Sequence, residues 1–436
     1  MNNVKIAAAV ALALGGYSSV HAAAVTPAQC ATPNDSIYVA GSSAAQPAFP
    51  LALAADLFDA NGVTTISATG GNGNFKAYCG FAKAGNSAGL ATGDIVTVYY
   101  RAEGGSVVGA LPIVSGKPIK QLDLTLPGCA VAGPVVNGTS ATVGTTDGWT
   151  GCVSAHKVEM GVTDLEPTVF TPPNYPSAYS VTVFGSANKT QLANLTSTRL
   201  FQQVFGLFVN TSGINGLGTG QAIDITRQTA ASILEGNYTD WAAVPTATGT
   251  AVSSVSAPIT IVNREAGSGT RTGATIFFLG TNCVNSAGTL FDPGPDGFAT
   301  GDVLATAAAT PGAITYASID NNGKQANLSM AKIDNVTPGN LVATSGEYGW
   351  WFEATAQKGT FSSPNASALY TFFTSGELSK VASAPHALDI LAIPNLNGNT
   401  AVVPVLGSAS TVGGVTIYVN PYTRGGNSCS IPGETN

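Results

Sequence analysis

Charged side chains are scarce in this sequence of 436 residues. Asp, Glu, Lys and Arg make up 9% of it, whereas hydrophobic residues make up 44%. The 17 basic and 24 acidic residues give a net charge of −7, and no run of Lys or Arg occurs. Because nucleic acids and anionic membrane surfaces are bound through clustered positive charge, we expect neither as a partner. The surface must consist largely of uncharged polar residues, which fits an exported protein.

Histidine is also rare, since only His21, His156 and His386 occur. No two cysteines have the spacing of a zinc knuckle or a redox pair. The turn 292–297 contains two aspartates, but its prolines and its lack of ligand spacing favour a plain turn over a calcium loop. We therefore expect no metal, no cofactor and no catalytic residue, and we interpret the histidines as ordinary surface or core residues.

Apolar runs long enough to span a membrane are absent beyond the N-terminus. There, Lys5, the apolar run 6–14 and three alanines at 22–24 predict a cleavable signal peptide over residues 1–24. Cys30 does not follow a small apolar run, so no lipid anchor is expected. The sequence thus predicts a periplasmic or secreted protein.

Six cysteines follow this segment, at positions 30, 79, 129, 152, 283 and 429. An even number in an oxidising compartment predicts up to three disulfides. Cys129 and Cys152 are the most local pairing and our first choice. The remaining connectivity stays open.

The most informative stretch is 263–273, which reads Asn-Arg-Glu-Ala-Gly-Ser-Gly-Thr-Arg-Thr-Gly. It follows a β-rich run at 259–262 and precedes an apolar run at 274–279. Such a strand, loop and helix unit turns backbone N–H groups toward one spot that favours negative charge. Arg264 adds a planar fork of donors, and Ser268 and Thr270 add hydroxyls. We infer an anion site; the alternative is a capped helix with Arg264 in a surface ion pair.

Similar units occur earlier in the chain. A strand over 36–40 leads through a small-residue loop at 41–47 into a predicted helix over 48–58. A strand over 64–68 leads through a Gly-rich turn at 69–74 into a predicted helix over 75–81. The strand 157–163 ends at Asp164. Because ligands of α/β sheets bind beyond the carboxyl ends of strands, these loops are expected to converge.

The rest of the chain alternates between strand and helix patterns. Between 82 and 158 the pattern loosens, with predicted strands over 95–101 and 106–114, and we interpret it as a β-rich insertion. Farther along we predict buried or apolar strands at 200–209 and 350–352, helices at 223–235, 301–308 and 367–378, and a hairpin within 400–419. The pattern predicts an α/β fold.

Taken in order, these loops resemble those of the periplasmic phosphate-binding proteins of ABC importers, within the type 2 periplasmic-binding-protein superfamily, and of the related secreted DING proteins. The resemblance covers most of the chain outside 82–158 and the C-terminal tail. Its motifs are Gly41-Ser42-Ser43 with Pro47, Thr69 to Gly73, Gly161 to Asp164, Ile233 to Trp241, Arg264 to Thr270, and Pro311 to Tyr316.

The resemblance implies two α/β lobes, joined by crossover strands, that close on a buried oxyanion. Lobe 1 would comprise 25–199 and 337–436, with the β-rich insertion, and lobe 2 would comprise 200–336. A monomer that delivers its ligand to a membrane permease of an ABC transporter is implied. Carried over by motif, the ligand-binding residues would be Arg264, Ser268, Gly269 and Thr270 from one lobe, and Ser43, Ala44, Ala45, Gly71, Asn72 and Asp164 from the other.

Asp164 bears on which anion this is. A carboxylate repels an anion unless the anion carries a proton that it can donate, so such a site can accept hydrogen phosphate and reject sulfate. The alternative is that Asp164 only caps the turn before Pro167. The sequence also departs from the family at Ala266, where an Asp is frequent, and at Ala45, Gln46 and Asn72. Phosphate is therefore the leading candidate among oxyanions.

Two other functions remain open from the sequence. A secreted DING-like protein could hydrolyse phosphate esters, although few histidines are available for catalysis. An extracellular structural or adhesive role on the same fold is favoured by the insertion, the uncharged surface and the C-terminal strands.

Overall fold

The computed structural model describes residues 24–68, 74–129, 131, 135–136, 151–170, 189–218, 220–280, 296–378, 390–391, 409–412 and 415–434. Gly71, Asn72, Cys283 and His386 lie outside these ranges, as does the expected signal peptide except for its last residue. None of the helices in the described ranges combines the length and the apolar character that a membrane span requires.

One mixed sheet runs through the described chain. Its strands follow the order β11-β14-β9-β17-β8-β1-β4-β3-β2-β6, and β15 and β18 also pair with β9. β1 pairs in parallel with β4 and β8, whereas β9 pairs antiparallel with β14 and β17. The strands are β1 (Asp35–Gly41), β2 (Thr64–Ala68), β3 (Phe75–Phe81), β4 (Ile95–Arg101), β6 (Val135–Val136), β8 (Met160–Thr163), β9 (Ser197–Asn210), β11 (Thr260–Ile261), β14 (Ala313–Ser318), β15 (Leu328–Met330), β17 (Trp351–Lys358) and β18 (Ile390–Leu391).

Helices cover this sheet, so the predicted α/β class is confirmed. The longer ones, α3, α5, α7 and α9, each bury apolar residues, and α3, α7 and α9 contact strands of the sheet. The helices are α1 (Pro27–Cys30), α2 (Ala48–Ala52), α3 (Val107–Ser115), α4 (Lys189–Ala193), α5 (Arg227–Leu234), α6 (Gly269–Ala274), α7 (Thr300–Ala309), α8 (Asn340–Thr344) and α9 (Pro364–Phe372). Short two-stranded pairs join β5 (Ile119–Leu122) with β7 (Val153–His156), β10 (Asp224–Ile225) with β16 (Lys332–Ile333), β12 (Asn263–Arg264) with β13 (Asp296–Gly297), β19 (Ala409–Val412) with β20 (Val415–Tyr418), and β21 (Tyr422–Thr423) with β22 (Gly433–Glu434).

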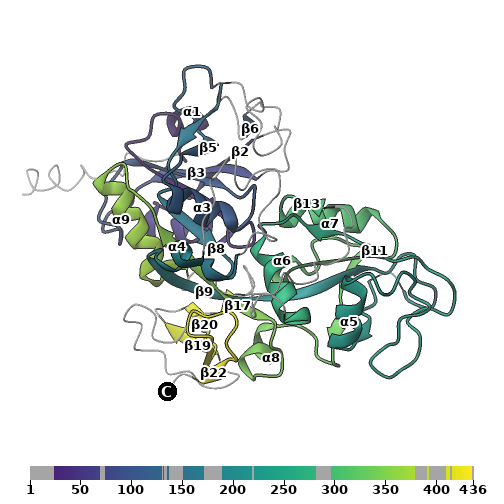
Figure 1. The fold of residues 1–436 in the computed structure, drawn as a ribbon. Coiled ribbons are helices and arrows are strands. Elements are labelled where there is room, and N and C mark those ends of the chain that lie inside the picture. The colour runs from purple at the N-terminus through teal and green to yellow at the C-terminus, as the bar shows by residue number, and fades with distance from the viewer. Residues whose placement is uncertain are drawn as a thin grey trace, which may run out of the picture.

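The elements form two groups that β9 and β17 connect (Figure 1). We call the group with α1 to α4, α9 and β1 to β8 lobe 1, and the group with α5 to α7 and β10 to β16 lobe 2. Each group has its own core: Phe49 and Phe373 belong to a core cluster of lobe 1, and Trp241 and Tyr316 belong to that of lobe 2. The exact domain boundaries given above stay a prediction.

Two predicted elements are wrong. Residues 75–81 form strand β3 instead of a helix, because Ala77 and Cys79 pack into one core cluster while Tyr78 packs into another on the opposite face. Residues 106–114 form most of helix α3 instead of a strand. Val107 to Pro112 are all buried, and a short continuous apolar run does not distinguish a buried helix from a buried strand.

The segment interpreted as an insertion is partly built into lobe 1. Its strand β4 lies between β1 and β3 in the main sheet. Gly104 and Gly105, which both have positive φ, turn the chain after β4 into α3. The predicted hairpin near the C-terminus is confirmed as β19 and β20.

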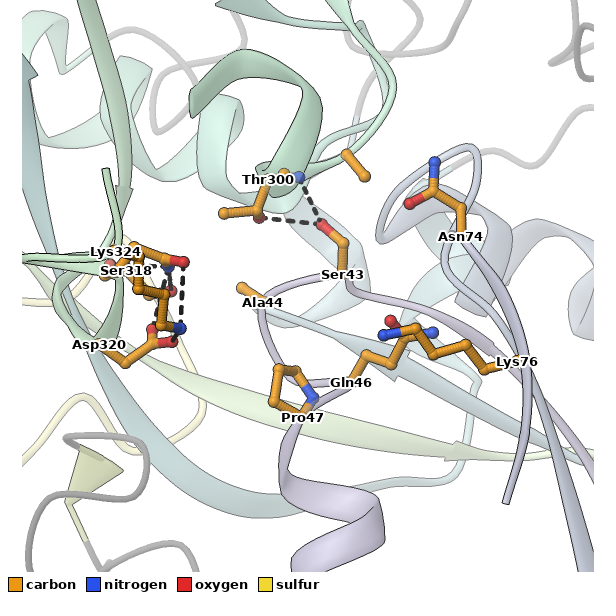
Figure 2. A pocket seen from close by; sticks show the side chains of 13 residues that line it. Ser43, Ala44, Gln46, Pro47, Asn74, Lys76, Thr300, Ser318, Asp320 and Lys324 are labelled. Atoms are coloured by element: carbon orange, nitrogen blue, oxygen red, sulfur yellow. Dashed lines mark hydrogen bonds and ion pairs between the residues drawn. The ribbon is translucent and has the colours of Figure 1, made fainter. Parts of the chain in front are cut away.

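The two lobes touch each other directly. The backbone N–H of Val107 donates to the carbonyl of Gly267 at 3.0 Å, and that of Gly104 donates to Oε1 of Glu265 at 3.1 Å. Ser43, in the loop after β1, faces Thr300 at the start of α7 (Figure 2), and their hydroxyls lie 3.1 Å apart. The structure therefore has the lobes closed on each other.

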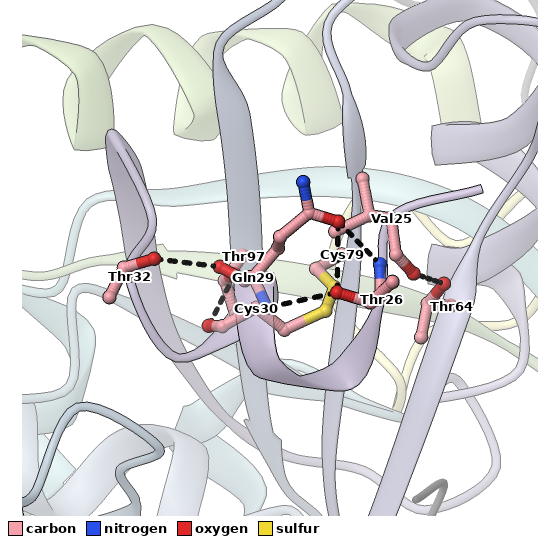
Figure 3. Close-up of a disulfide and its surroundings, with 8 residues drawn as sticks. All are labelled: Val25, Thr26, Gln29, Cys30, Thr32, Thr64, Cys79 and Thr97. Atoms are coloured by element: carbon pink, nitrogen blue, oxygen red, sulfur yellow. Dashed lines mark hydrogen bonds between the residues drawn. A yellow bond between two sulfur atoms is a disulfide. The ribbon is translucent and has the colours of Figure 1, made fainter. Parts of the chain in front are cut away.

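Disulfide bonds cross-link segments of lobe 1. The predicted bond between Cys129 and Cys152 is confirmed. A second bond joins Cys30 of α1 to Cys79 of β3 (Figure 3), where Thr64 also donates to the carbonyl of Val25 at 2.6 Å. Cys429 is also disulfide-bonded.

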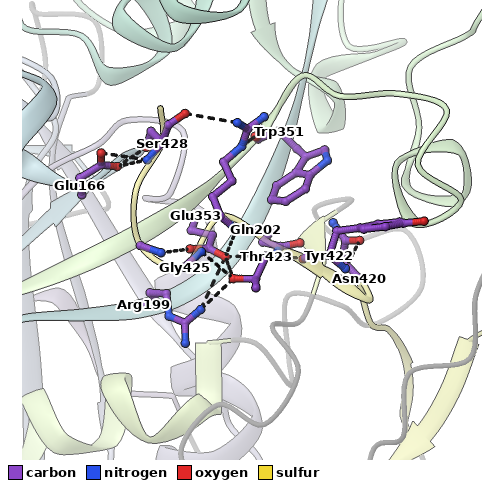
Figure 4. A network of polar contacts seen from close by, with 12 residues as sticks. Glu166, Arg199, Gln202, Trp351, Glu353, Asn420, Tyr422, Thr423, Gly425 and Ser428 are labelled. Atoms are coloured by element: carbon purple, nitrogen blue, oxygen red, sulfur yellow. Dashed lines mark hydrogen bonds and ion pairs between the residues drawn. The ribbon is translucent and has the colours of Figure 1, made fainter. Parts of the chain in front are cut away.

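The C-terminal residues fasten the connecting strands. Glu353 of β17 is 3% exposed and accepts hydrogen bonds from the Thr423 hydroxyl and from the backbone N–H groups of Arg424 and Gly426 (Figure 4). Ser428 likewise donates to Glu166, which lies just beyond β8. Buried carboxylates need hydrogen-bond donors, so the C-terminal residues help to stabilise the connection between the lobes.

Arg424 makes the densest contacts of the tail. Its guanidinium donates to the carbonyls of Gly349, Trp351, Ser428 and Ser430 at 2.8–3.2 Å. It also lies 4.9 Å from the ring centroid of Trp351. A lysine has no planar fork and cannot reach this many acceptors at once.

Arg424→Lys should therefore lower the free energy of unfolding by about 1–3 kcal/mol, because buried carbonyls lose their donors. Urea unfolding followed by fluorescence measures the change. Arg199→Lys is the matched control, since Arg199 contacts Glu353 from a half-exposed position at 3.6 Å and its replacement should cost less than about 1 kcal/mol. Equal losses in the two variants would contradict the assigned role.

Candidate functional site

The centre of the candidate site is the buried side chain of Arg264, in β12. It is 1% exposed and lies where lobe 2 meets the loop after β1. Its Nη2 donates to Ser43 Oγ at 3.2 Å and to the Phe298 carbonyl at 3.4 Å, and its Nη1 donates to Thr300 Oγ1 at 3.3 Å. Its Nε has no partner. The structure thus brings Arg264 and Ser43 into contact, while their role in binding a ligand stays a prediction.

The side-chain hydrogen-bond partners of Arg264 are neutral hydroxyl and carbonyl oxygens. It makes no ion pair with any residue that the structure describes. Burial lowers the pKa of the guanidinium, although the charges of Asp164, Glu265 and Asp302 oppose this. A buried charge that is neither paired nor fully hydrogen-bonded costs several kcal/mol. An anion at this point would relieve that cost.

Asp164 forms a second buried group beside Arg264. It follows β8, is 2% exposed, and accepts hydrogen bonds from the hydroxyl of Ser42 and from Thr270 Oγ1, the latter at 3.1 Å. Ser106 Oγ accepts from its backbone N–H at 3.1 Å. Burial raises the pKa of Asp164, and the hydrogen bond from Ser42 and the charge of Arg264 oppose the rise. The turn-capping alternative is not observed, because both carboxylate oxygens face hydroxyls.

The loop 265–270 reaches Asp164 from lobe 2. Ser268 is the N-cap of α6, and its hydroxyl accepts from the backbone N–H of Arg271 at 3.2 Å. Gly269 follows, and a Cβ there would lie 2.4 Å from Ser106 Oγ and 2.7 Å from Asp164 Oδ2. Only glycine permits this approach, so the predicted residues Gly269 and Thr270 are brought against Asp164, whereas the hydroxyl of Ser268 is used for capping.

Ala44 and Ala45, the other predicted residues of the loop after β1, stabilise this loop through backbone hydrogen bonds. The backbone N–H of Ala45 donates to Ser42 Oγ at 2.9 Å, so it holds the loop in shape. The carbonyl of Ala44 accepts from Gln203 Nε2 at 3.1 Å, which links the loop to the connecting strand β9. Gly71 and Asn72 lie outside the described residues.

Arg264 is oriented without the Asp that is frequent at the position of Ala266. Its carbonyl accepts from Arg271 Nη1 at 2.7 Å, and its backbone N–H donates to the Tyr316 hydroxyl at 3.3 Å. These contacts come from α6 and β14, which pack against β12. In place of an Asp at position 266, the backbone contacts of Arg264 and the hydroxyls of Ser43 and Thr300 therefore hold the Arg264 side chain in position.

Sequence reasoning missed Thr300, Ser42 and Ser106. The helix that begins at Thr300 was expected at 301–308, but nothing local indicated that its first residue would meet Ser43 across the gap between the lobes. Ser42 lies in the motif Gly41-Ser42-Ser43, so the sequence did indicate that it is near the site. Ser106 was assigned to a predicted strand, which hid its position at the start of α3.

A separate polar cluster contains His156. His156 Nε2 lies 2.9 Å from Asp123 Oδ2, and Ser154 Oγ contacts both groups. Burial alone would raise the pKa of Asp123, but hydrogen bonds from His156, Ser154 and Thr125 outweigh it and hold the pKa well below its usual value. Serine and aspartate meet the same ring nitrogen, whereas a catalytic triad places them on opposite nitrogens. Within the described ranges, no cluster of three or more metal-ligating residues occurs.

The described residues form a mixed α/β fold of two lobes that meet over the buried Arg264, which has no ion-pair partner among them. The family model of the PBP superfamily domain matches residues 193–375, less than half of the chain. The predicted resemblance to the periplasmic-binding-protein superfamily is confirmed over these residues. No curated protein matches the chain.

Several solved structures resemble the chain along most of its length. One is a protein assigned as a phosphate ABC transporter substrate-binding protein from Clostridium perfringens, solved with bound phosphate; it is 15% identical, with 82% of this chain and 99% of that one covered and a TM-score of 0.48. Another is the periplasmic phosphate-binding protein PfluDING, 13% identical, with 84% and 92% covered and a TM-score of 0.46. A phosphate-binding protein from Stenotrophomonas maltophilia is 12% identical, with 84% and 92% covered and a TM-score of 0.43.

The contact between α6 and Asp164 can be tested without any ligand. Gly269→Ala should lower the free energy of unfolding by about 1–3 kcal/mol, because the added methyl group overlaps Ser106 and Asp164. Gly218→Ala is the control: its nearest neighbour would lie 3.8 Å away, so the change should stay within about 0.5 kcal/mol. If chemical unfolding gave Gly269→Ala the stability of the wild type, the close approach of the lobes would be refuted.

Proposed function

We propose that the protein binds phosphate, or a similar tetrahedral oxyanion, between its two lobes. The observation that carries this proposal is the buried guanidinium of Arg264, which has no carboxylate partner among the described residues. Ser43 and Thr300, whose hydroxyls already contact it, supply further donors from the two lobes. An oxyanion accepts several such hydrogen bonds at once, and charge assistance makes each one strong.

The position of Asp164 supports phosphate over sulfate. Its carboxylate accepts from Ser42 and Thr270 and interacts with the charge of Arg264, but burial raises its pKa, so a second ionised group beside it is disfavoured unless that group brings a hydrogen-bond donor of its own. Hydrogen phosphate brings such a donor, whereas sulfate has none at neutral pH and would leave the acceptor and itself in repulsion.

We infer binding without catalysis. The cluster of Ser154, His156 and Asp123 lacks the geometry of a hydrolytic triad, and it belongs to lobe 1 alone. In the buried cradle, the hydroxyls of Ser42 and Thr270 both donate to the single carboxylate of Asp164, and we assign this arrangement to ligand selection rather than to activation of a nucleophile.

The proposed setting is outside the cytoplasm, where the protein, as a monomer, would hand its ligand to the membrane permease of an ABC importer. The predicted cleavable signal peptide and the two disulfides of lobe 1, Cys30–Cys79 and Cys129–Cys152, support an oxidising compartment. The match of residues 193–375 to the superfamily domain supports a solute-binding role.

Arg264→Met should weaken phosphate binding on the order of 100-fold or more, because the anion loses its charge-assisted donors. Isothermal titration calorimetry of the purified protein, freed of bound anions by unfolding and refolding, measures this. Arg199→Met, which removes a half-exposed cation from β9, should bind like the wild type. A wild-type protein that gives no heat with phosphate, or an unchanged affinity in Arg264→Met, would refute the proposal.

Asp164→Asn should invert the preference between anions. The amide can donate to a fully ionised anion, so we expect sulfate affinity to rise by about tenfold while phosphate affinity falls. Competition of sulfate against phosphate in the same calorimetric assay reports both. If the ratio of the two affinities did not move, Asp164 would have no part in selecting the anion.

A further inference from the structure

A small cavity adjoins the cradle of Arg264 (Figure 2). Its volume is about 170 Å³, and both lobes form its walls. A pocket for a drug-sized ligand measures roughly 300–1,000 Å³, so this one suits a small substituent. It is lined by Ser43, Ala44, Gln46, Pro47, Asn74, Lys76, Ala299, Thr300, Gly301, Ser318, Asp320, Asn321 and Lys324.

Unused hydrogen-bond donors gather on the lobe 1 wall of this cavity. Gln46 is 5% exposed and Asn74 is 4% exposed, yet neither Gln46 Nε2 nor Asn74 Nδ2 has a partner in the structure. An unsatisfied buried donor costs about 1–3 kcal/mol, and native proteins retain few of them. Two such donors on one cavity wall indicate that a ligand supplies the acceptor.

Lys76 adds a positive charge to the same wall. It lies in β3, is half-buried, and forms no ion pair with the residues that the structure describes. Burial lowers the pKa of its ammonium group, so an anionic neighbour would be favourable. The opposite wall differs, because Lys324 there is paired with Asp320 at 2.8 Å. The free donors and the free charge therefore belong to lobe 1.

The cavity and the cradle share a boundary. Ser43 and Thr300 line the cavity, and the same two hydroxyls contact the guanidinium of Arg264. An oxyanion held by Arg264 would thus have one of its oxygens directed toward the cavity, where an ester substituent could continue. An inorganic phosphate would leave the donors of Gln46 and Asn74 unused.

We propose that the ligand is a small phosphate monoester whose organic part carries a carboxylate, held by Gln46, Asn74 and Lys76. This inference rests on the proposed function, since it places the phosphoryl group of the ester at Arg264. Two amide donors and one ammonium match the two oxygens of a carboxylate, and the neutral hydroxyl of a polyol would satisfy them less well.

The test compares three probes by calorimetry on the full chain freed of bound anions: inorganic phosphate, 3-phosphoglycerate and glycerol 3-phosphate. The two esters have the same carbon skeleton and differ in a carboxylate against a hydroxymethyl group. We expect the wild type to bind 3-phosphoglycerate at least about tenfold more tightly than glycerol 3-phosphate. Lys76→Met and Gln46→Met should each reduce that ratio several-fold and leave the affinity for phosphate unchanged.

The control is Lys117→Met, which removes an exposed lysine that does not line the cavity and should keep the ratio. A ratio near one in the wild type, with phosphate still bound, would overturn this inference alone. A preference that survives in both Lys76→Met and Gln46→Met would overturn it as well. Absence of phosphate binding in the wild type would instead refute the proposed function.

Discussion

The guanidinium of Arg264 is buried where two lobes meet, and the structure around it is arranged to tolerate that charge. Its neighbours are hydroxyls and a carbonyl, and they come from both lobes: Ser43 from one, Thr300 and Phe298 from the other. Neutral acceptors soften the cost of desolvation but do not remove it. The close contacts between the lobes, including the approach of Gly269 to Asp164, therefore enclose a site whose charge is still to be matched. The proposed ligand supplies the missing negative charge.

The parts of this arrangement that are encoded locally could be predicted from the sequence. Small residues after β1, the carboxylate after β8 and the Gly-Ser-Gly-Thr run before α6 each interrupt an apolar pattern in a few residues, so their place at strand ends can be recognised. Cys129 and Cys152 could be paired because they are close in sequence. These segments are expected to lie close together because the α/β topology brings the ends of its strands to one edge of the sheet.

The other parts depend on contacts that no local pattern records. Most residues of strand β3 and helix α3 are buried, so these elements lack the clear polar face that reveals a period. The hydroxyls of Ser43 and Thr300 meet although 257 positions separate them in the chain. The donors of Gln46 and Asn74 have meaning only once the cavity beside them is known. Local patterns pointed to residues within single loops, but they could not identify Thr300, whose place in the site depends on its contact with Ser43 of the other lobe.

The C-terminal residues make the connection between the lobes depend on the last part of the chain. Strand β17 lies between β8 of lobe 1 and the connecting strand β9, and its buried carboxylate Glu353 accepts hydrogen bonds from residues 423, 424 and 426 as well as from Gln202 of β9. Trimming of the chain before residue 423 would therefore leave Glu353 and Glu166 buried with fewer donors, far in sequence from the Arg264 site but next to the strands that join its two halves.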